Sequence, residues 1–232
     1  VDSMRREFAT MWDKALVSVD RNEIDYISMN LSQVSARDMV IPILETASFK
    51  QFAEWIEMLH PDLPKSPPVF SSGIEMRRAG EEDLDMFESI WSDALGELTD
   101  GLATFDDFAS RADWAGALTL NSEVIGFAFN GTSINGDGEV LTAAITPSHW
   151  GNGYGRELLE AALYQLRTVD HGRAVIRVRP DVRQALKVCS ELGMRHSSGG
   201  IEWRRSIDEE EIHLELEAKR KAGVKARFGG WR

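Results

Sequence analysis

One stretch, GEVLTAAITPSHWGNGYGRELL at 138–159, restricts the fold of this chain more than any other part of the sequence. Its small and β-branched residues predict a strand that stops at Pro147, and a loop with Gly151, Gly153 and Gly155 then leads directly into a helix. Glycines let the main chain approach an anion closely, and the free N–H groups at a helix start attract it. The pattern indicates an α/β fold with a phosphate-binding loop, to which Arg156 adds a positive charge.

Two familiar nucleotide motifs do not match this loop. The dinucleotide motif G-x-G-x-x-G, started at Gly151, requires a glycine at 156, where the chain has Arg156. The P-loop motif G-x-x-x-x-G-K-[ST] is absent. The loop also lies late in a series of hairpins rather than in an opening βαβ unit, so neither class of nucleotide site is expected.

The chain from Gly73 onward carries the pattern of a mixed α/β domain. The Asn121-Ser122 step predicts a tight hairpin, and Gly193 predicts the end of a helix. The expected strands are 73–78, 114–120, 123–131, 138–146, 173–179, 194–197 and 201–205, and the expected helices are 81–95, 104–111, 153–168 and 181–192.

A family resemblance rests on two motifs. Residues 145–156 resemble motif A of the GNAT superfamily of acyl-CoA-dependent N-acyltransferases, a strand followed by [QR]-x-x-G-x-[GA]. Gly153 and Gly155 take the glycine positions, and Trp150 replaces Gln or Arg. The run Trp-Gly-x-Gly-Tyr is similar to the branch that acetylates ribosomal-protein N-termini. Residues 181–194 resemble motif B, N-x-x-A-x-x-x-Y-x-x-x-G-F, with Val182 at the Asn position.

The resemblance covers 73 to about 206 and implies the fold and the cofactor. The implied fold is α/β (α+β), with a mixed, mostly antiparallel central sheet flanked by helices. The implied cofactor is acetyl-CoA (coenzyme A), whose pyrophosphate would bind the main-chain N–H groups of the loop: Trp150, Gly151, Asn152, Gly153, Tyr154, Gly155 and Arg156. Its pantetheine arm would pair with Ala144, Ile145 and Thr146.

Acyl transfer to an amine needs a group that removes a proton, because a free ammonium has a pKa near ~10. Glu139 is the leading candidate, since the gapless register of 138–155 is similar to the histone-acetyltransferase branch and places its catalytic Glu there. A solvated turn residue is the alternative interpretation of Glu139. His149 is a second titratable group near the loop, and Glu123, Asp106 and Asp107 are further candidates for an acceptor pocket.

The general acid departs from the family pattern. Motif B often supplies a Tyr that protonates the coenzyme A thiolate, and Cys189 stands at that position. A thiol with a pKa near ~8.5 could donate a proton. The alternative interpretation is a small buried side chain beside Leu186 and Leu192.

The chain before and after this domain has a different composition. All 19 glycines lie at Gly73 or later, and four of the seven prolines lie within 61–68. We therefore expect a helical N-terminal segment at 1–70, a GNAT domain at 71–206 and a C-terminal helix or tail at 207–232. The expected N-terminal helices are 8–16, 35–44, bent or interrupted at Pro42, and one behind Ser48 with Phe52, Trp55, Ile56 and Leu59 on its apolar face.

Charge and hydropathy limit the classes of partner that this chain is expected to bind. A net charge of −12 disfavours nucleic acid, and no apolar run approaches the length of a membrane span. The single Cys and the absence of a signal-peptide pattern favour a cytoplasmic protein. The chemistry above favours a protein without a metal. Whether Val1 opens a processed chain or part of a longer one stays open, as does a homodimer.

The expected function is transfer of an acetyl group from acetyl-CoA to a primary amine, of a small molecule or a peptide, by direct attack in a ternary complex. One alternative is a non-catalytic acyl-CoA-binding module, because Val182 and Cys189 depart from motif B. Another is acetylation of a protein N-terminus or lysine.

Overall fold

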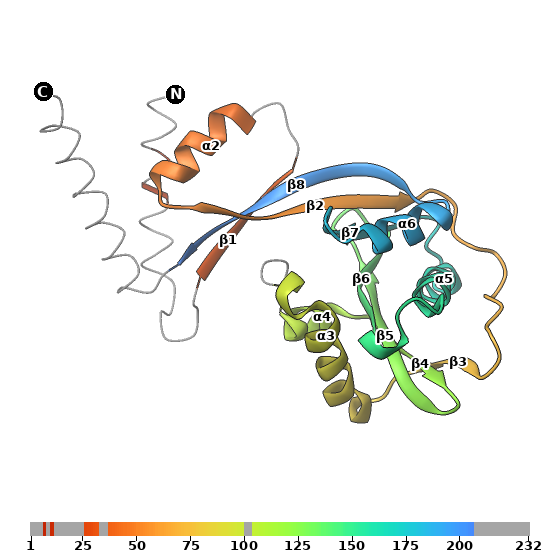
Figure 1. The fold of residues 1–232 in the computed structure, drawn as a ribbon. Helices are drawn as coiled ribbons and strands as arrows, with labels where there is room; N and C mark the ends of the chain where they lie inside the picture. The colour runs from red at the N-terminus through yellow and green to blue at the C-terminus, as the bar shows by residue number, and fades with distance from the viewer. Residues whose placement is uncertain (1–6, 8–9, 12–25, 33–36, 100–103, 207–232) are drawn as a thin grey trace, which may run out of the picture. The chain divides into compact units, whose positions relative to one another are not determined.

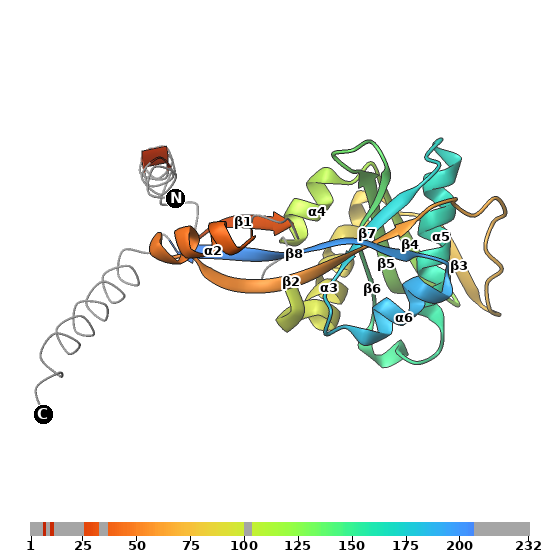
Figure 2. The ribbon, with the colours of Figure 1, turned by 90° about the horizontal axis from the view of Figure 1, so that it is seen from above.

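The computed structural model describes residues 7, 10–11, 26–32, 37–99 and 104–206 (Figure 1). The chain divides into two compact units. Unit 1 comprises Val1–Phe52 and Ile201–Arg232, and unit 2 comprises Ala53–Gly200. Two long strands, β2 (Lys50–His60) and β8 (Arg195–Ser206), each contribute residues to both units and are neighbours in the sheet (Figure 2).

Among the described residues, eight strands form one sheet in the order β1-β8-β2-β7-β6-β5-β4-β3. The remaining strands are β1 (Tyr26–Ser32), β3 (Ile74–Arg78), β4 (Trp114–Leu120), β5 (Glu123–Thr132), β6 (Gly138–Ile145) and β7 (Ala174–Val178). The pairs β3–β4, β4–β5, β5–β6 and β2–β7 are antiparallel, whereas β6 and β7 run parallel. This is the mixed, mostly antiparallel sheet that the sequence predicted.

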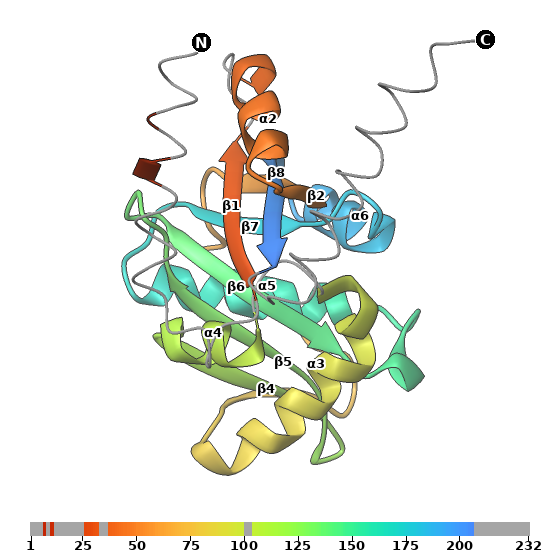
Figure 3. The same cartoon turned by 90° about the vertical axis from the view of Figure 1, so that its left-hand side faces the viewer.

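Helices cover both faces of the sheet in unit 2 (Figure 3). One face packs against α3 (Leu84–Thr99) and α4 (Phe105–Arg111) through a cluster of buried phenylalanines, Phe87, Phe105, Phe108, Phe127 and Phe129. The other face packs against α5 (Tyr154–Thr168) and α6 (Arg183–Glu191) through leucines such as Leu158 and Leu163. We call these the α3–α4 face and the α5–α6 face.

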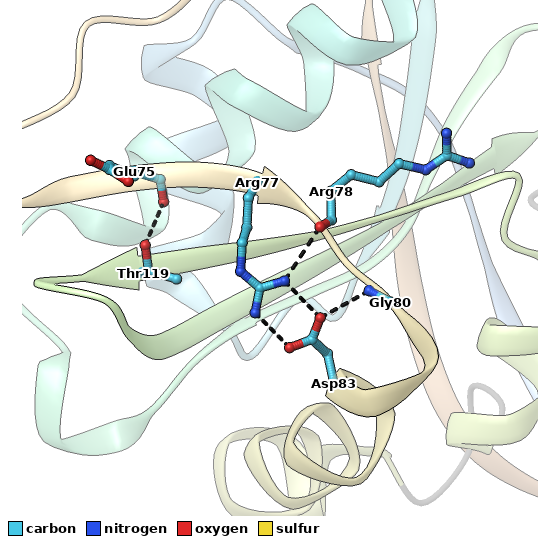
Figure 4. Close-up of polar contacts among 6 residues, drawn as sticks. All are labelled: Glu75, Arg77, Arg78, Gly80, Asp83 and Thr119. Carbon is cyan, nitrogen blue, oxygen red and sulfur yellow. Dashed lines mark hydrogen bonds and ion pairs between the residues drawn. The ribbon is translucent and has the colours of Figure 1, made fainter.

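The start of α3 is tied to the edge strand β3 by a buried carboxylate (Figure 4). Asp83, in the 3₁₀ turn η1 (Glu81–Asp83), accepts two hydrogen bonds from the Arg77 guanidinium at 2.7 and 2.6 Å and one from the Gly80 N–H at 2.9 Å. Arg77 Nη1 also donates to the Arg78 carbonyl at 3.3 Å. The Arg77 hydrogen bonds hold the pKa of Asp83 below its usual value.

In unit 2 the expected elements are found within a few residues of their predicted ends. One difference concerns the last strands, because 194–197 and 201–205 belong to a single strand, β8. Residues 207–232, expected as a helix, lie outside the described residues.

The expected helical segment at 1–70 is wrong in two places. Residues 26–32 form strand β1, and residues 50–60, expected as a helix, form strand β2. The spacing of Phe52, Trp55, Ile56 and Leu59 fits a helix, but these aromatic and branched residues also suit a strand, and β7 and β8 supply partners along both sides of β2. The helix at 35–44 is confirmed as α2 (Arg37–Thr46), which continues through Pro42. Of the helix expected at 8–16, the described residues 10 and 11 are helical.

Two βαβ segments of the chain end their helices in the same way. After α2, the N–H groups of residues 47, 48 and 49 donate to the carbonyls of 43, 45 and 44. After α6, the N–H groups of residues 192, 193 and 194 donate to the carbonyls of 188, 190 and 189. Each donor and acceptor lies 145 positions after its counterpart at α2. Leu44 and Phe49 are buried in unit 1 as Cys189 and Met194 are in unit 2. The segments β1-α2-β2 and β7-α6-β8 therefore share both element order and turn geometry.

Candidate active site

Strands β6 and β7 are paired only where they begin. Their register joins Gly138 to Ala174, Glu139 to Val175 and Val140 to Ile176, and it stops there. Beyond this point β6 continues to pair with β5 through Ile145, and β7 continues to pair with β2 through Val178. The carboxyl ends of two parallel strands thus part from each other, which is where open α/β sheets bind ligands.

A bulge in β6 lies at the point of parting. The register with β5 shifts between Phe129, opposite Thr142, and Asn130, opposite Val140, so Leu141 is the extra residue. A bulge bends its strand and increases the local twist. It therefore helps β6 to turn away from β7 just after their last shared pair.

The glycine loop follows the end of β6 at this opening. Pro147–His149 form a short 3₁₀ turn, η2. The N–H groups of His149 and Trp150 donate to the carbonyls of Thr146 and Pro147. The exposed Trp150 side chain is anchored because its indole N–H donates to the Ile145 carbonyl at 2.7 Å. Gly151 and Gly153 then adopt φ values of +83° and +88°, a region in which other residues are strained.

The loop presents a row of unused main-chain donors. The first N–H groups of α5 that donate within the protein are those of Arg156 and Glu157, both to the Gly153 carbonyl. Among the described residues, no protein acceptor bonds the N–H groups of the five residues before them, Gly151, Asn152, Gly153, Tyr154 and Gly155. These donors lie at the positive end of a 15-residue helix. Main-chain donors in this arrangement are suited to bind an anion.

The surface of this loop is bare main chain, which fits a diphosphate. All three glycines are exposed, and a Cβ placed on Gly151 or Gly153 would meet no atom within 4 Å. The Arg156 side chain is about half exposed and lies 3.7 Å from Glu191 on α6, which also faces Lys187 at 3.8 Å. Two exposed cations therefore lie at the loop and on the neighbouring helix.

Ala144, Ile145 and Thr146 lie at the end of β6 beside the opening. The side chains of Ala144 and Ile145 are buried on opposite faces of the sheet. The Ile145 carbonyl is used by Trp150, and the Thr146 N–H donates to the Ile125 carbonyl at 2.8 Å. Pairing of a pantetheine arm with this stretch would rest on its other main-chain groups.

Comparison with known proteins decides the family. The Acetyltransferase (GNAT) family profile matches residues 78–194, just over half of the chain. The chain belongs to the GNAT acetyltransferase family. The matched residues contain β4 to β7, the glycine loop and α6, so the family region coincides with the site described above.

Solved structures support the same fold at low sequence identity. A GCN5-related N-acetyltransferase from Sphaerobacter thermophilus is similar over 87% of this chain and 66% of its own, with 13% identity and a TM-score of 0.61. A tandem GNAT protein from the clavulanic acid biosynthesis pathway is similar over 85% and 69%, with 12% identity and a TM-score of 0.61. A GCN5-related N-acetyltransferase from Kribbella flavida covers 77% and 68%, with 17% identity and a TM-score of 0.56.

The chain spans less than two thirds of the first three similar structures, 66%, 61% and 65% of their lengths. Comparison with curated proteins gives no match. Within the described ranges, no helix is long and apolar enough to cross a bilayer, and no three acidic, His or Cys side chains gather as metal ligands would.

In this GNAT protein Glu139 lies at the closed end of the β6–β7 pair. Its side chain is buried, and Oε2 accepts a hydrogen bond from Arg111 at the end of α4 at 3.0 Å. Glu139 lies opposite Gly131 on β5 and shares the α3–α4 face with Leu141. Oε1 accepts no hydrogen bond from any described residue. The side chain is therefore held by Arg111 and not solvated in a turn.

Cys189 lies in the core of the GNAT domain. Its side chain is 1% exposed and packs in the α5–α6 cluster with residues such as Leu158 and Met194. Burial raises the pKa of its thiol to about 11. These properties favour the interpretation of Cys189 as a small buried side chain over that of a proton donor.

The other candidates are not brought together by the fold. His149 is half-buried in the loop, with its Nδ1 3.0 Å from the Ser148 hydroxyl. Asp106 and Asp107 are exposed at the start of α4, where Asp107 caps the helix together with Thr104. Glu123 is exposed at the beginning of β5.

The structure adds residues that the sequence patterns missed. Trp55 and Glu57 on β2 lie beside Arg177 on β7, one position beyond the last β6–β7 pair. The helix expected behind Ser48 concealed them, because it removed β2 from the sheet. The aromatic and branched residues among the charged ones along 53–60 were the available signal, because such residues also suit a strand.

Proposed function

We propose that this GNAT protein transfers an acyl group, most simply acetyl, from its coenzyme A thioester to a primary amine within a ternary complex. The observation that carries the proposal is the row of five unused N–H groups at the start of α5, at the open end of β6 and β7. Membership of the family supplies the reaction class. The amine nitrogen would bond to the acyl carbon as the carbon–sulfur bond breaks.

The loop would hold the diphosphate of coenzyme A. The main-chain donors of 151–155 and the Arg156 side chain supply positive potential, and the exposed glycines let phosphate oxygens approach the main chain. The cofactor supplies an activated carbonyl as its thioester. Main-chain groups at 144–146, on the strand that leads into the loop, would orient the arm that carries it.

Glu139 would act as the base. Its Oε1 is free of protein partners, while Arg111 holds Oε2 and so fixes the orientation of the carboxylate. Glu139 would take the proton of the attacking amine, directly or through one water. Water would protonate the departing sulfur, since Cys189 is buried and its thiol has a pKa of about 11.

Residues 26–60 would form part of the transferase fold. Strand β2 pairs with β7 along Ile56–His60, so it supports β7 on the side away from β6. The shared turn geometry of α2 and α6 supports a second unit of motif B type at 26–60. One similar structure is a tandem GNAT protein, which is consistent with a second unit of this kind.

Calorimetric titration with acetyl-CoA, followed by an assay of coenzyme A release, tests the proposal. We expect binding in the micromolar range and turnover with at least one class among polyamines, aminoglycosides, amino acids and peptides. Absence of binding at high micromolar concentrations would refute the proposal. Binding without turnover on the whole panel would favour the non-catalytic acyl-CoA-binding module, to which the burial of Cys189 at the motif B position points.

A further inference from the structure

Arg177 lies beside the candidate base on the open side of β7. Glu139 is opposite Val175 in the parallel pair, and Arg177 follows Val175 by two residues, so side chains at 139, 175 and 177 share the α3–α4 face. The spacing of strands and residues separates positions 139 and 177 by on the order of 8–10 Å. Because β6 and β7 stop pairing after Ile176, Arg177 lies at the mouth of their opening.

The Arg177 guanidinium is held in place by a ring and not by hydrogen bonds. Its central carbon lies 4.8 Å from the centre of the Trp55 ring on β2, and Trp55 is buried. Stacking on an aromatic face orients a guanidinium while leaving the N–H groups at its edge free. Arg177 is about half exposed.

Glu57 forms a long ion pair with Arg177 through one carboxylate oxygen, and its other oxygen is hydrogen-bonded to two serines. Glu57, opposite Arg177 in the β2–β7 pair, places Oε2 4.0 Å from Arg177 Nε, which is beyond hydrogen-bonding distance. Its Oε1 accepts hydrogen bonds from the hydroxyls of Ser197 and Ser198 at 2.9 and 3.1 Å. Among the described residues, no side-chain acceptor bonds the Arg177 guanidinium.

We propose that Arg177 binds a carboxylate of the acyl acceptor, so that the acceptor is an amine that also carries a carboxylate and has the size of an amino acid. This inference rests on the proposed function. A guanidinium binds a carboxylate through two parallel hydrogen bonds, and a ring-held Arg177 offers that edge without rearrangement. Positions 139 and 177 lie on one face on the order of 8–10 Å apart, a separation that suits the few bonds between an amine and a carboxylate.

Turnover of amino acids and of their carboxamides, such as alanine and alaninamide, tests the proposal with acetyl-CoA as donor. We expect Arg177→Gln to lower the ratio of kcat/KM for the acid over the amide by about 10- to 100-fold relative to the unchanged protein, mainly through KM. Comparing ratios cancels the difference in basicity between the two amines. Arg177→Lys, which keeps the charge but not the paired donors, should give an intermediate ratio.

Arg173→Gln is the matched control. Arg173 is also exposed and precedes β7, but its guanidinium is bound to Asp137 at the opposite end of the strand. We expect the acid-to-amide ratio to stay unchanged in this variant. An equal loss for acid and amide in Arg177→Gln, or no preference for acids in the unchanged protein, would overturn the carboxylate site while the proposed function stands.

A binding measurement separates the inference from the reaction. Equilibrium binding of the same pairs to the protein saturated with coenzyme A needs no turnover. Tighter binding of acids than amides, lost in Arg177→Gln, would support the site even if no acyl transfer occurred. Equal binding of both would reject the site, and absence of acetyl-CoA binding would reject the proposed function.

Discussion

Ser48 and Gly193 end two different helices in the same left-handed conformation, with φ values of +65° and +86°. In both turns the next residue, Phe49 or Met194, donates its N–H to the carbonyl five positions earlier. This is the hydrogen-bond pattern of a Schellman turn, and glycine is the residue that it favours. The second turn follows that preference, whereas the first forms without a glycine.

Gly193→Ser should therefore fold and lose stability by about 1 kcal/mol, because a Cβ is strained at positive φ. The nearest atom to an added Cβ, His60 Nε2, is 4.0 Å away, so the cost is conformational and not a clash. Urea denaturation measures the change. Gly172→Ser is the control, since Gly172 has open space and no positive φ. Equal effects at both positions would contradict the conformational explanation.

Gly153→Ala should weaken acetyl-CoA binding by at least tenfold in calorimetry. A methyl group would stand beside the main-chain donors, and φ of +88° would shift toward a value that alanine prefers. Gly136→Ala is a close control, because Gly136 also has a φ of +83° and open space but lies in the β5–β6 turn. Both variants should lose similar stability, and only Gly153→Ala should lose affinity. Similar affinities for the two would count against the loop.

Glu139→Gln should keep acetyl-CoA affinity and lose rate mainly below about pH 8. Near pH 10, a larger share of the amine is neutral without help, so the deficit should shrink there. Coenzyme A release measured from pH 6.5 to 10 gives the profile. Glu123→Gln, an exposed glutamate at the start of β5, should leave the profile unchanged. A uniform loss at every pH would point to a structural role for the Glu139–Arg111 pair.

Asp83→Asn should destabilise the protein at pH 7 by about 1–2 kcal/mol, because hydrogen bonds to a charged group are lost. The pKa of Asp83 is lowered by Arg77 from 3.8, so the stabilisation is complete above that value and disappears as the pH falls below it. The difference in stability between the unchanged protein and Asp83→Asn, measured by urea denaturation, should therefore be full near neutral pH and shrink as the pH falls through the pKa of Asp83. Asp62→Asn, in an exposed pair with Lys65, should change little.

Cys189 should resist thiol reagents in the folded protein and react on unfolding, since it is buried and its pKa is about 11. Cys189→Ala should retain kcat while losing about 1 kcal/mol of stability from the core. A large loss of kcat at unchanged stability would place the thiol in the chemistry instead.

Much of unit 2 followed from local patterns. The glycine loop was predictable because positive φ at Gly151 and Gly153 and the free N–H groups of a helix start depend on a few adjacent residues. The hairpin at Asn121-Ser122 and the helix end at Gly193 are local for the same reason. Glu139 could be named as the candidate base because the family register ties it to the loop through one continuous strand, and that role stays a prediction.

The remaining features depend on residues far apart in the chain. Whether 50–60 became a helix or a strand was decided by β7 and β8, which lie more than a hundred positions away and supply its hydrogen bonds. The same pairing brings Trp55 to Arg177. By itself the amino-acid order determined the glycine loop and the family, since backbone conformation and helix ends are local. Only tertiary structure decided which face Glu139 and Arg177 share, because side-chain neighbours across a sheet are set by strand order.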